Sequence, residues 1–127
     1  MEIIIKKGIK GHQQQQVALK DTAKTYGSGS VEVFATPAMI AMMEQTAHTS
    51  LQNFLPEGFT TVGTHLNIEH SKATPLGAKV WCESVLESQD GRKLTFSVIA
   101  YDESGIIGKG THERFIVNIE KFMSKLK

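Results

Sequence analysis

The sequence predicts an α+β domain, in which one antiparallel β-sheet wraps around one long central α-helix. Three observations support this fold class. Residues 33–55, VFATPAMIAMMEQTAHTSLQNFL, read as a single helix with apolar residues on nearly every side. After residue 59 the hydrophobic period changes to two, which is typical of strands. Asp90-Gly91 then separates two such stretches and is a strong hairpin signal.

Length and composition fit one ordinary soluble domain. The chain has 127 residues, of which 40% are hydrophobic and 21% charged, so we treat 1–127 as a single domain. Its net charge of +1 implies no broad attraction to nucleic acid or to membranes, and neither is expected as a partner. Cys82 is the only cysteine, which excludes an intrachain disulfide, and no secretory signal is evident. A cytoplasmic location is therefore expected.

The central helix is expected to run from Pro37 to about Phe54. Thr36 is expected to be its N-cap, because a threonine hydroxyl can accept from an unpaired N–H of the first turn. Pro37 suits the first helical position, and the Pro-Glu-Gly sequence at 56–58 ends the helix. A helix that is apolar all round is expected to be buried all round, and this one is too short and interrupted to cross a bilayer.

One carboxylate, Glu44, lies in the middle of this apolar run. A buried carboxylate needs a partner, or its pKa rises. Glu44 is therefore a candidate for chemistry. The alternative is a structural contact with His48, one helical turn further on.

The segments before the helix give weaker signals. The β-branched run at residues 3–5 is expected to form a short edge strand, and residues 13–19 are amphipathic at best. Residues 21–30, DTAKTYGSGS, are expected to form a loop that leads into the helix.

Four strands are expected after the helix, followed by a basic surface tail at 120–127. Within the first strand, Leu66, Ile68 and His70 share a face with Thr64. The glycines of the last strand indicate a bulge or bend. A sheet of this kind leaves a long edge unpaired, so we expect edge-to-edge pairing into a homodimer with a continuous sheet. The expected strands cover residues 60–70, 79–86, 93–101 and 106–119.

This organisation resembles the hotdog-fold acyl-CoA thioesterases, most closely the fluoroacetyl-CoA thioesterase branch. The segments that carry the resemblance, in this order and spacing, are EVFATPAMIAMMEQTA at 32–47, TVGTHLNIEH at 61–70, ATP at 73–75, GRKLTF at 91–96 and IGKGTHERFIV at 107–117. The resemblance implies a hotdog fold and hydrolysis of an acyl-CoA thioester. It implies no cofactor and no metal, because coenzyme A is part of the substrate.

The resemblance also implies which residues act. The branch's catalytic threonine, glutamate and histidine match Thr36, Glu44 and His70. Its substrate-binding positions match the V-G-T turn, with Gly63 and Thr64, and the arginine of the H-E-R segment. That arginine is Arg114.

One departure concerns the stretch before the helix. The fluoroacetyl-specific member shields its pocket there with aromatic residues, whereas residues 27–30 here are Gly-Ser-Gly-Ser, with only Tyr26 nearby. We therefore expect a substrate other than fluoroacetyl-CoA, and a pocket that is more open or differently closed.

The residues fit thioester hydrolysis. Glu44 can attack the thioester carbonyl as a nucleophile, giving an anhydride, or act as a general base on water. His70 can orient Glu44 or shuttle a proton. Thr36 at the helix N-terminus, together with the N–H of Gly63, can stabilise an oxyanion.

Structural explanations stand beside these roles. Thr36 can be only a cap, His70 a core or strand-end histidine, and Arg114 half of a surface salt bridge. His112 shares the strand face of Arg114 and can meet the same ligand or the solvent, whereas Cys82 is expected in the core. Two other functions remain open: a hotdog hydratase or dehydratase that leaves the thioester whole, and a non-catalytic acyl-CoA binding module.

Overall fold

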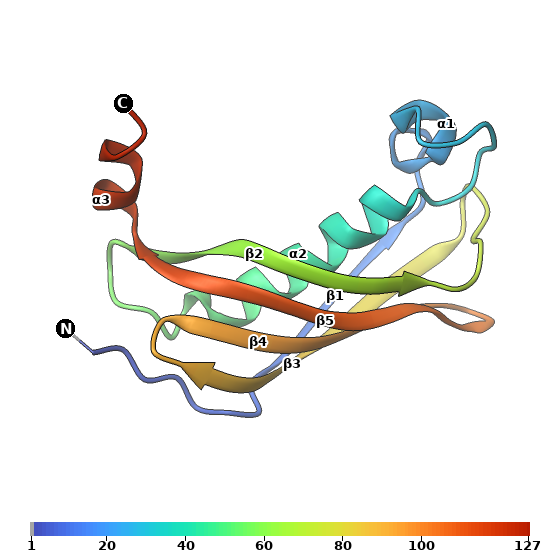
Figure 1. Ribbon diagram of the computed structural model, residues 1–127. Helices are drawn as coiled ribbons and strands as arrows, with labels where there is room; N and C mark the ends of the chain where they lie inside the picture. Colours follow the sequence, from blue (N-terminus) through green and yellow to red (C-terminus); the bar gives the residue numbers. More distant parts are fainter. Residues whose placement is uncertain (1) are drawn as a thin grey trace.

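The computed structural model describes residues 2–127 and has one antiparallel five-stranded sheet that curls around one long helix (Figure 1). This confirms the predicted α+β class. The sheet order is β1-β3-β4-β5-β2, so β1 and β2 form its two edges. The elements in chain order are β1 (Lys10–Gln16), a 3-10 helix (Leu19–Asp21), α1 (Ala23–Tyr26), α2 (Thr36–Gln52), β2 (Phe59–His70), β3 (Lys79–Asp90), β4 (Lys93–Asp102), β5 (Gly105–Asn118) and α3 (Ile119–Ser124).

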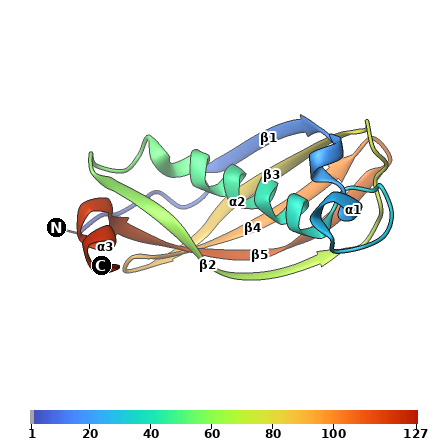
Figure 2. The same ribbon diagram turned by 90° about the horizontal axis from the view of Figure 1, so that it is seen from above.

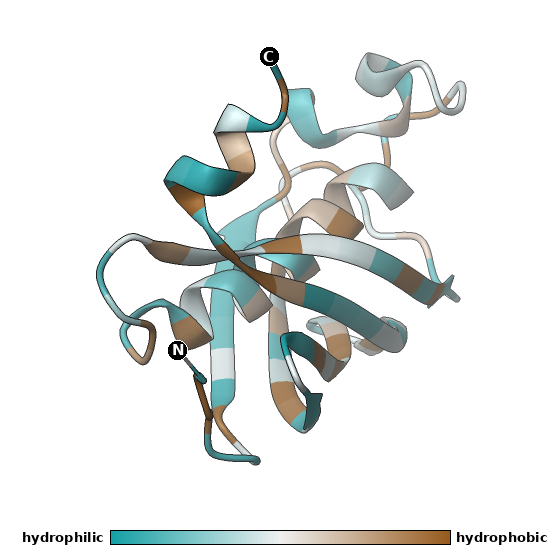
Figure 3. Ribbon diagram, turned by 60° about the vertical axis from the view of Figure 1, so that its left-hand side comes forward, coloured by the Kyte–Doolittle hydropathy of each residue, from teal (hydrophilic) through white to brown (hydrophobic). Residues whose placement is uncertain are grey.

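The hydrophobic core lies between α2 and the concave face of the sheet. Along β3 and β4 the side chains alternate in burial, and hydrophobic and hydrophilic residues form alternating bands on the strands in Figure 3. Cys82 is fully buried here, as expected, and burial raises its pKa to about 11. The buried hydrophobic residues of α2 are Ala38, Met39, Met42, Met43, Ala47 and Leu51.

The prediction that α2 is buried all round was wrong. The helix lies on the sheet with β1 on one side and β2 on the other, which leaves its outer flank open (Figure 2). Residues 36, 37, 41 and 45 are exposed, and residues 40, 44 and 48 are half-buried. A single sheet covers only one side of a helix, so the other side of α2 stays partly exposed in this chain.

The start of α2 also differs from the prediction. Ala35 occupies the N-cap position, with extended backbone, and Thr36 is the first helical residue, so Pro37 is the second. The hydroxyl of Thr36 is therefore not the cap and is free to bond elsewhere.

The predicted edge strand at residues 3–5 was wrong, because the edge strand is β1 at Lys10–Gln16. Residues 3–5 are held instead by one side chain, Gln89. The N–H of Ile5 donates to its Oε1 (2.8 Å), and its Nε2 donates to the carbonyl of Ile3 (2.7 Å). Gly8, with φ of 95°, then turns the chain into β1.

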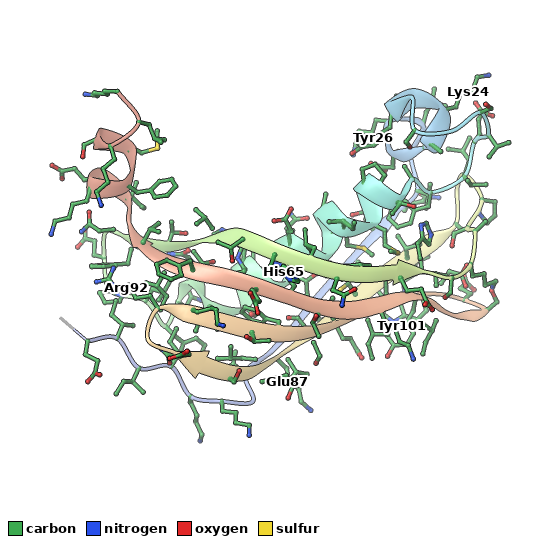
Figure 4. The ribbon with its side chains drawn as sticks, viewed as in Figure 1. Lys24, Tyr26, His65, Glu87, Arg92 and Tyr101 are labelled. Atoms are coloured by element: carbon green, nitrogen blue, oxygen red, sulfur yellow. The ribbon has the colours of Figure 1, made fainter. Side chains whose placement is uncertain are left out.

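Short helices occupy two segments that were expected to be irregular. The predicted loop at 21–30 contains α1, whose N-terminus is capped by Thr22, and this region rises at one end of α2, where Figure 4 labels Lys24 and Tyr26. The tail contains α3, which projects from the other end of the sheet (Figure 1). Within residues 2–127 no helix is long and apolar enough to cross a membrane.

Strand β2 contains a bulge that changes which of its side chains lie on each face of the sheet. Gly63 pairs with Arg114 and His65 pairs with Glu113, so Thr64 is the extra residue between them. Thr61 is buried before the bulge, whereas Ile68 and His70 are the more buried residues after it. The predicted face of Leu66, Ile68 and His70 is confirmed, but the bulge separates Thr64 from it.

Candidate active site

The first group of predicted site residues joins the start of α2 to the end of β2. Oγ1 of Thr36 lies 2.7 Å from Nδ1 of His70, in hydrogen-bonding contact. Both side chains line a pocket of about 340 Å³ at this end of the molecule. The other residues around this pocket are Ala23, Ser28, Val33, Phe34, Ser71, Lys72 and Ala73.

The environment of His70 favours its neutral form. Burial lowers its pKa from the ordinary value, so the imidazole is uncharged near neutral pH. Its Nε2 is buried and has no hydrogen-bond partner among residues 2–127. A neutral imidazole beside a hydroxyl can take up or pass on a proton.

The second group surrounds Glu44 in the middle of α2. Oε2 of Glu44 lies 3.5 Å from Nη1 of Arg114. The same oxygen lies against the backbone of Gly63, so close that a Cβ at this position would collide with it. The side chain of Glu44 is 39% exposed, so the expectation of a buried carboxylate was wrong: it lies on the open flank of α2, beside the edge strand β2.

Arg114 is the centre of a buried hydrogen-bond network and not part of a surface salt bridge. Its side chain is only 7% exposed. Nε donates to Oγ1 of Thr61 (2.8 Å), Nη2 donates to the carbonyl of Thr61 (3.0 Å), and Nη1 lies 3.1 Å from Nε2 of His112. The other ring nitrogen of His112 contacts the carbonyl of His65 at 2.9 Å.

Sequence reasoning did not assign Thr61 or His112 to the site. The signal for His112 was present, because residues 112 and 114 share one face of a strand. Thr61 could not be assigned from the sequence, because its place near Arg114 depends on strand pairing. Thr61 lies opposite Ile116 on β5, two residues from Arg114. Thr64 is exposed at the bulge, and its hydroxyl donates to the carbonyl of Glu113 (3.2 Å). Its role in substrate binding stays a prediction.

The predicted catalytic residues fall into two groups within one chain. Thr36 and His70 touch each other, and Glu44 touches Arg114 instead of either of them. Eight residues separate Thr36 from Glu44 along α2, which corresponds to about 12 Å. No hydrogen bond joins Glu44 to His48 within the described chain, so the structural alternative for Glu44 receives no support.

One antiparallel sheet wrapped around one long helix is the architecture of the hotdog fold. Residues 17–120 match the fluoroacetyl-CoA-specific thioesterase family. The chain belongs to this family, and it is a thioester hydrolase.

Individual relatives resemble this chain in sequence and in fold. The fluoroacetyl-CoA thioesterase of Streptantibioticus cattleyicolor is 38% identical over 96 residues, which are 76% of this chain and 69% of that protein. A crystal structure of a point mutant of the fluoroacetyl-CoA-specific thioesterase, in complex with fluoroacetate and CoA, superposes with a TM-score of 0.87 at 31% identity, covering 93% of this chain and 99% of that one. A hot-dog-like protein from Thermanaerovibrio acidaminovorans gives 0.86 at 25% identity, covering 94% and 89%.

Proposed function

We propose that this protein hydrolyses the thioester of a small or medium acyl-CoA, with Glu44 as nucleophile or general base, assisted by His70 and Thr36. One observation carries the proposal. Glu44 is a carboxylate on the open flank of α2, held by a buried arginine and set against a strand backbone that has no side chain at that point. Such a carboxylate is accessible to a substrate and fixed in direction, as an attacking group must be.

The separation of the two groups in one chain leads us to propose that the site is completed across a homodimer. Residues 36, 40, 44 and 48 form one stripe on the open flank of α2, because they are four apart. If two copies of α2 lie antiparallel about a two-fold axis near Ile40, Thr36 of one chain comes opposite Glu44 of the other. A two-fold interface produces this arrangement twice.

The edge strand supports the same axis. His70 contacts Thr36, and Gly63 lies against Glu44, so β2 contributes one residue to each of the two groups. The point midway between Gly63 and His70 lies near Leu66. Residues 63–67 are all exposed, and β2 has a strand on only one side within the described chain. Antiparallel pairing of two β2 edges around Leu66 gives the continuous sheet predicted from the sequence.

In this composite site the chemistry has two routes. In the first, a carboxylate oxygen of Glu44 attacks the thioester carbon, the C–S bond breaks, and water hydrolyses the resulting anhydride. In the second, Glu44 takes a proton from water while the hydroxide adds to the same carbon. In both routes the thiolate of CoA leaves and is protonated. The Thr36–His70 pair of the partner subunit supplies a hydroxyl for the oxyanion and an imidazole that relays the proton.

The segment before α2 supports an acyl group other than fluoroacetyl. Ser28 lines the pocket beside Thr36 and His70, and its neighbours at residues 27–30 are small. The relative whose structure holds fluoroacetate and CoA is a fluoroacetyl-CoA-specific thioesterase. We propose that the small residues here leave room for a longer or differently shaped acyl chain.

A thiol-trapping assay over a panel of acyl-CoA substrates tests the proposal. Purified protein should release CoA from one class of acyl-CoA, and Glu44→Gln should lower kcat by about a hundredfold or more. Gln45→Ala, one residue further on and exposed, is the matched control and should keep wild-type activity.

Other outcomes of the same panel point elsewhere. Hydration of an enoyl-CoA without thiol release would identify a hydratase, and tight binding with neither product would identify a binding module. Unchanged hydrolysis in Glu44→Gln would refute the role of Glu44.

A further inference from the structure

His112 is a fully buried histidine for which the proposed reaction has no use. It lies on β5, two residues before Arg114, and faces α2. Nε2 of its ring is 3.1 Å from Nη1 of Arg114, and Nδ1 is 2.9 Å from the carbonyl oxygen of His65. Both ring nitrogens are therefore in hydrogen-bond contact, although the residue is away from solvent.

The partners of His112 allow only one protonation state. A guanidinium can only donate hydrogen bonds, so Nε2 of His112 must accept from Arg114. A backbone carbonyl can only accept, so Nδ1 must carry the proton and donate to His65. The ring is therefore a neutral Nδ1–H imidazole.

The guanidinium of Arg114 is fixed by these contacts on three sides. Thr61 accepts from Nε through its hydroxyl and from Nη2 through its carbonyl, and His112 accepts from Nη1. The second N–H of Nη1 is directed at Oε2 of Glu44. Four of five donors then have a partner, and removal of one acceptor from a buried guanidinium lets it rotate or leaves a donor unpaired.

We propose that His112 is a positioning residue: as a neutral Nδ1–H imidazole it holds the guanidinium of Arg114 in the orientation that fixes the carboxylate of Glu44. Its importance for turnover rests on the function proposed for Glu44. The orientation of Arg114 does not depend on that function, and it can be measured separately.

The charged and titratable groups around His112 make the arrangement sensitive to acid. Arg114 and Glu113 lie on its own strand, Glu44 faces it from α2, and β2 contributes the carbonyl of His65. From β4 it meets the ring of Phe96, at 6.3 Å between centroids. Burial is the main cause that lowers the pKa of His112. Protonation would place a second donor against Arg114 and break the contact.

His48, also on α2, belongs to the same surroundings. Burial and then the charge of Arg114 lower its pKa as well. Any titration assigned to His112 must therefore be separated from that of His48, which a measurement resolved for each ring achieves.

The direct test is the ¹⁵N spectrum of the histidine rings in the whole protein, assigned with His112→Gln. The ring of His112 should show the Nδ1–H tautomer at pH 7, and the side-chain N–H signals of Arg114 should be sharp and slow to exchange. An Nε2–H tautomer or an imidazolium at pH 7 would overturn the proposal. This result does not depend on catalysis, so a protein without thioesterase activity would refute the proposed function alone.

Two variants then test the consequence for turnover. His112→Phe keeps the ring volume but removes the acceptor, and should lower kcat about tenfold with little change in KM. His112→Gln restores an acceptor within reach of Arg114 and should recover most of the lost kcat, with a flatter acid limb in its pH profile. His12→Gln, which removes an exposed histidine on β1, is the control. Equal kcat in the wild type and a folded His112→Phe would contradict the proposal.

Discussion

Oγ1 of Thr36 and Nδ1 of His70 lie 2.7 Å apart, although 34 residues separate them in the sequence. Thr36 is the first residue of α2 and not its cap, and its hydroxyl bonds to the ring of His70 at the end of β2. The start of the helix and the end of the first long strand are thereby joined by a pair that can bind and transfer a proton.

This contact gives a prediction for Thr36. Thr36→Val keeps the shape of the side chain but removes the hydroxyl, and should lower kcat by about a hundredfold. Thr36→Ser should retain most of the activity. If the hydrogen bond between Thr36 and His70 were only structural, its loss would instead cost about 1 kcal/mol of stability and leave kcat unchanged. Urea unfolding of both variants beside the activity assay separates the two roles, and an equally active Thr36→Val would remove Thr36 from the mechanism.

Gly63 gives a second prediction, because it is the point where β2 meets the carboxylate. Gly63 does not have a positive φ, so its backbone conformation is compatible with alanine. A Cβ there would collide with Oε2 of Glu44 and lie 3.3 Å from Cε1 of His112 and 3.4 Å from Nη1 of Arg114. Gly63→Ala should therefore displace the flexible end of Glu44 and lower kcat by about tenfold or more.

The control for Gly63→Ala is Thr111→Ala on the neighbouring strand β5. It removes an exposed side chain on the opposite strand face from His112 and Arg114, so a strand is altered without contact with Glu44. Stability should change by less than about 1 kcal/mol in both variants. Equal kcat in both variants and in the wild type would show that Gly63 is not needed for the position of Glu44.

The lowered pKa values of three histidines predict how the stability of the fold depends on pH. Burial lowers the pKa of His48, His70 and His112 below the ordinary value of 6.5. Below pH 6.5 the unfolded chain therefore binds protons that the folded chain does not, so the free energy of unfolding falls as the pH drops from 6.5 toward the lowered pKa values. Above pH 6.5 these groups are neutral in both states and contribute no dependence.

Urea unfolding at several values between pH 5 and pH 8 measures this slope. His112→Gln removes one of the three groups and should make the decline shallower between pH 6.5 and pH 5. A wild-type stability that is constant or increases toward pH 5 would contradict neutral burial of these histidines.

The helix and the strands after it could be predicted from the sequence because their signals are local. The apolar run of α2, the period-two pattern of the strands and the Asp90-Gly91 turn each specify an element without reference to the rest of the chain. The N-terminal edge strand could not be predicted in this way. A β-branched run at residues 3–5 has strand propensity, but Gln89 supplies its hydrogen bonds, whereas polar residues 10–16 pair with β3.

The site was predictable in its residue types but not in its distances. The resemblance pointed to Thr36, Glu44 and His70, and the first and last of these are in contact within one chain. Glu44 lies in another group because eight helical residues separate it from Thr36. The bulge at Thr64 changes which residues of β2 face α2, and a bulge depends on pairing with β5 that no local pattern in β2 records.

The most direct test of the proposed site is a mixed dimer. Thr36→Val and Glu44→Gln chains carry different affinity tags and are co-expressed, and purification on both tags in turn retains only dimers that contain one chain of each kind. If each site joins Thr36 and His70 of one chain to Glu44 of the other, one of the two sites in the mixed dimer is intact. CoA release should then recover to about half of the wild-type kcat per dimer. Activity no higher than that of the two variants alone would contradict a site shared between chains.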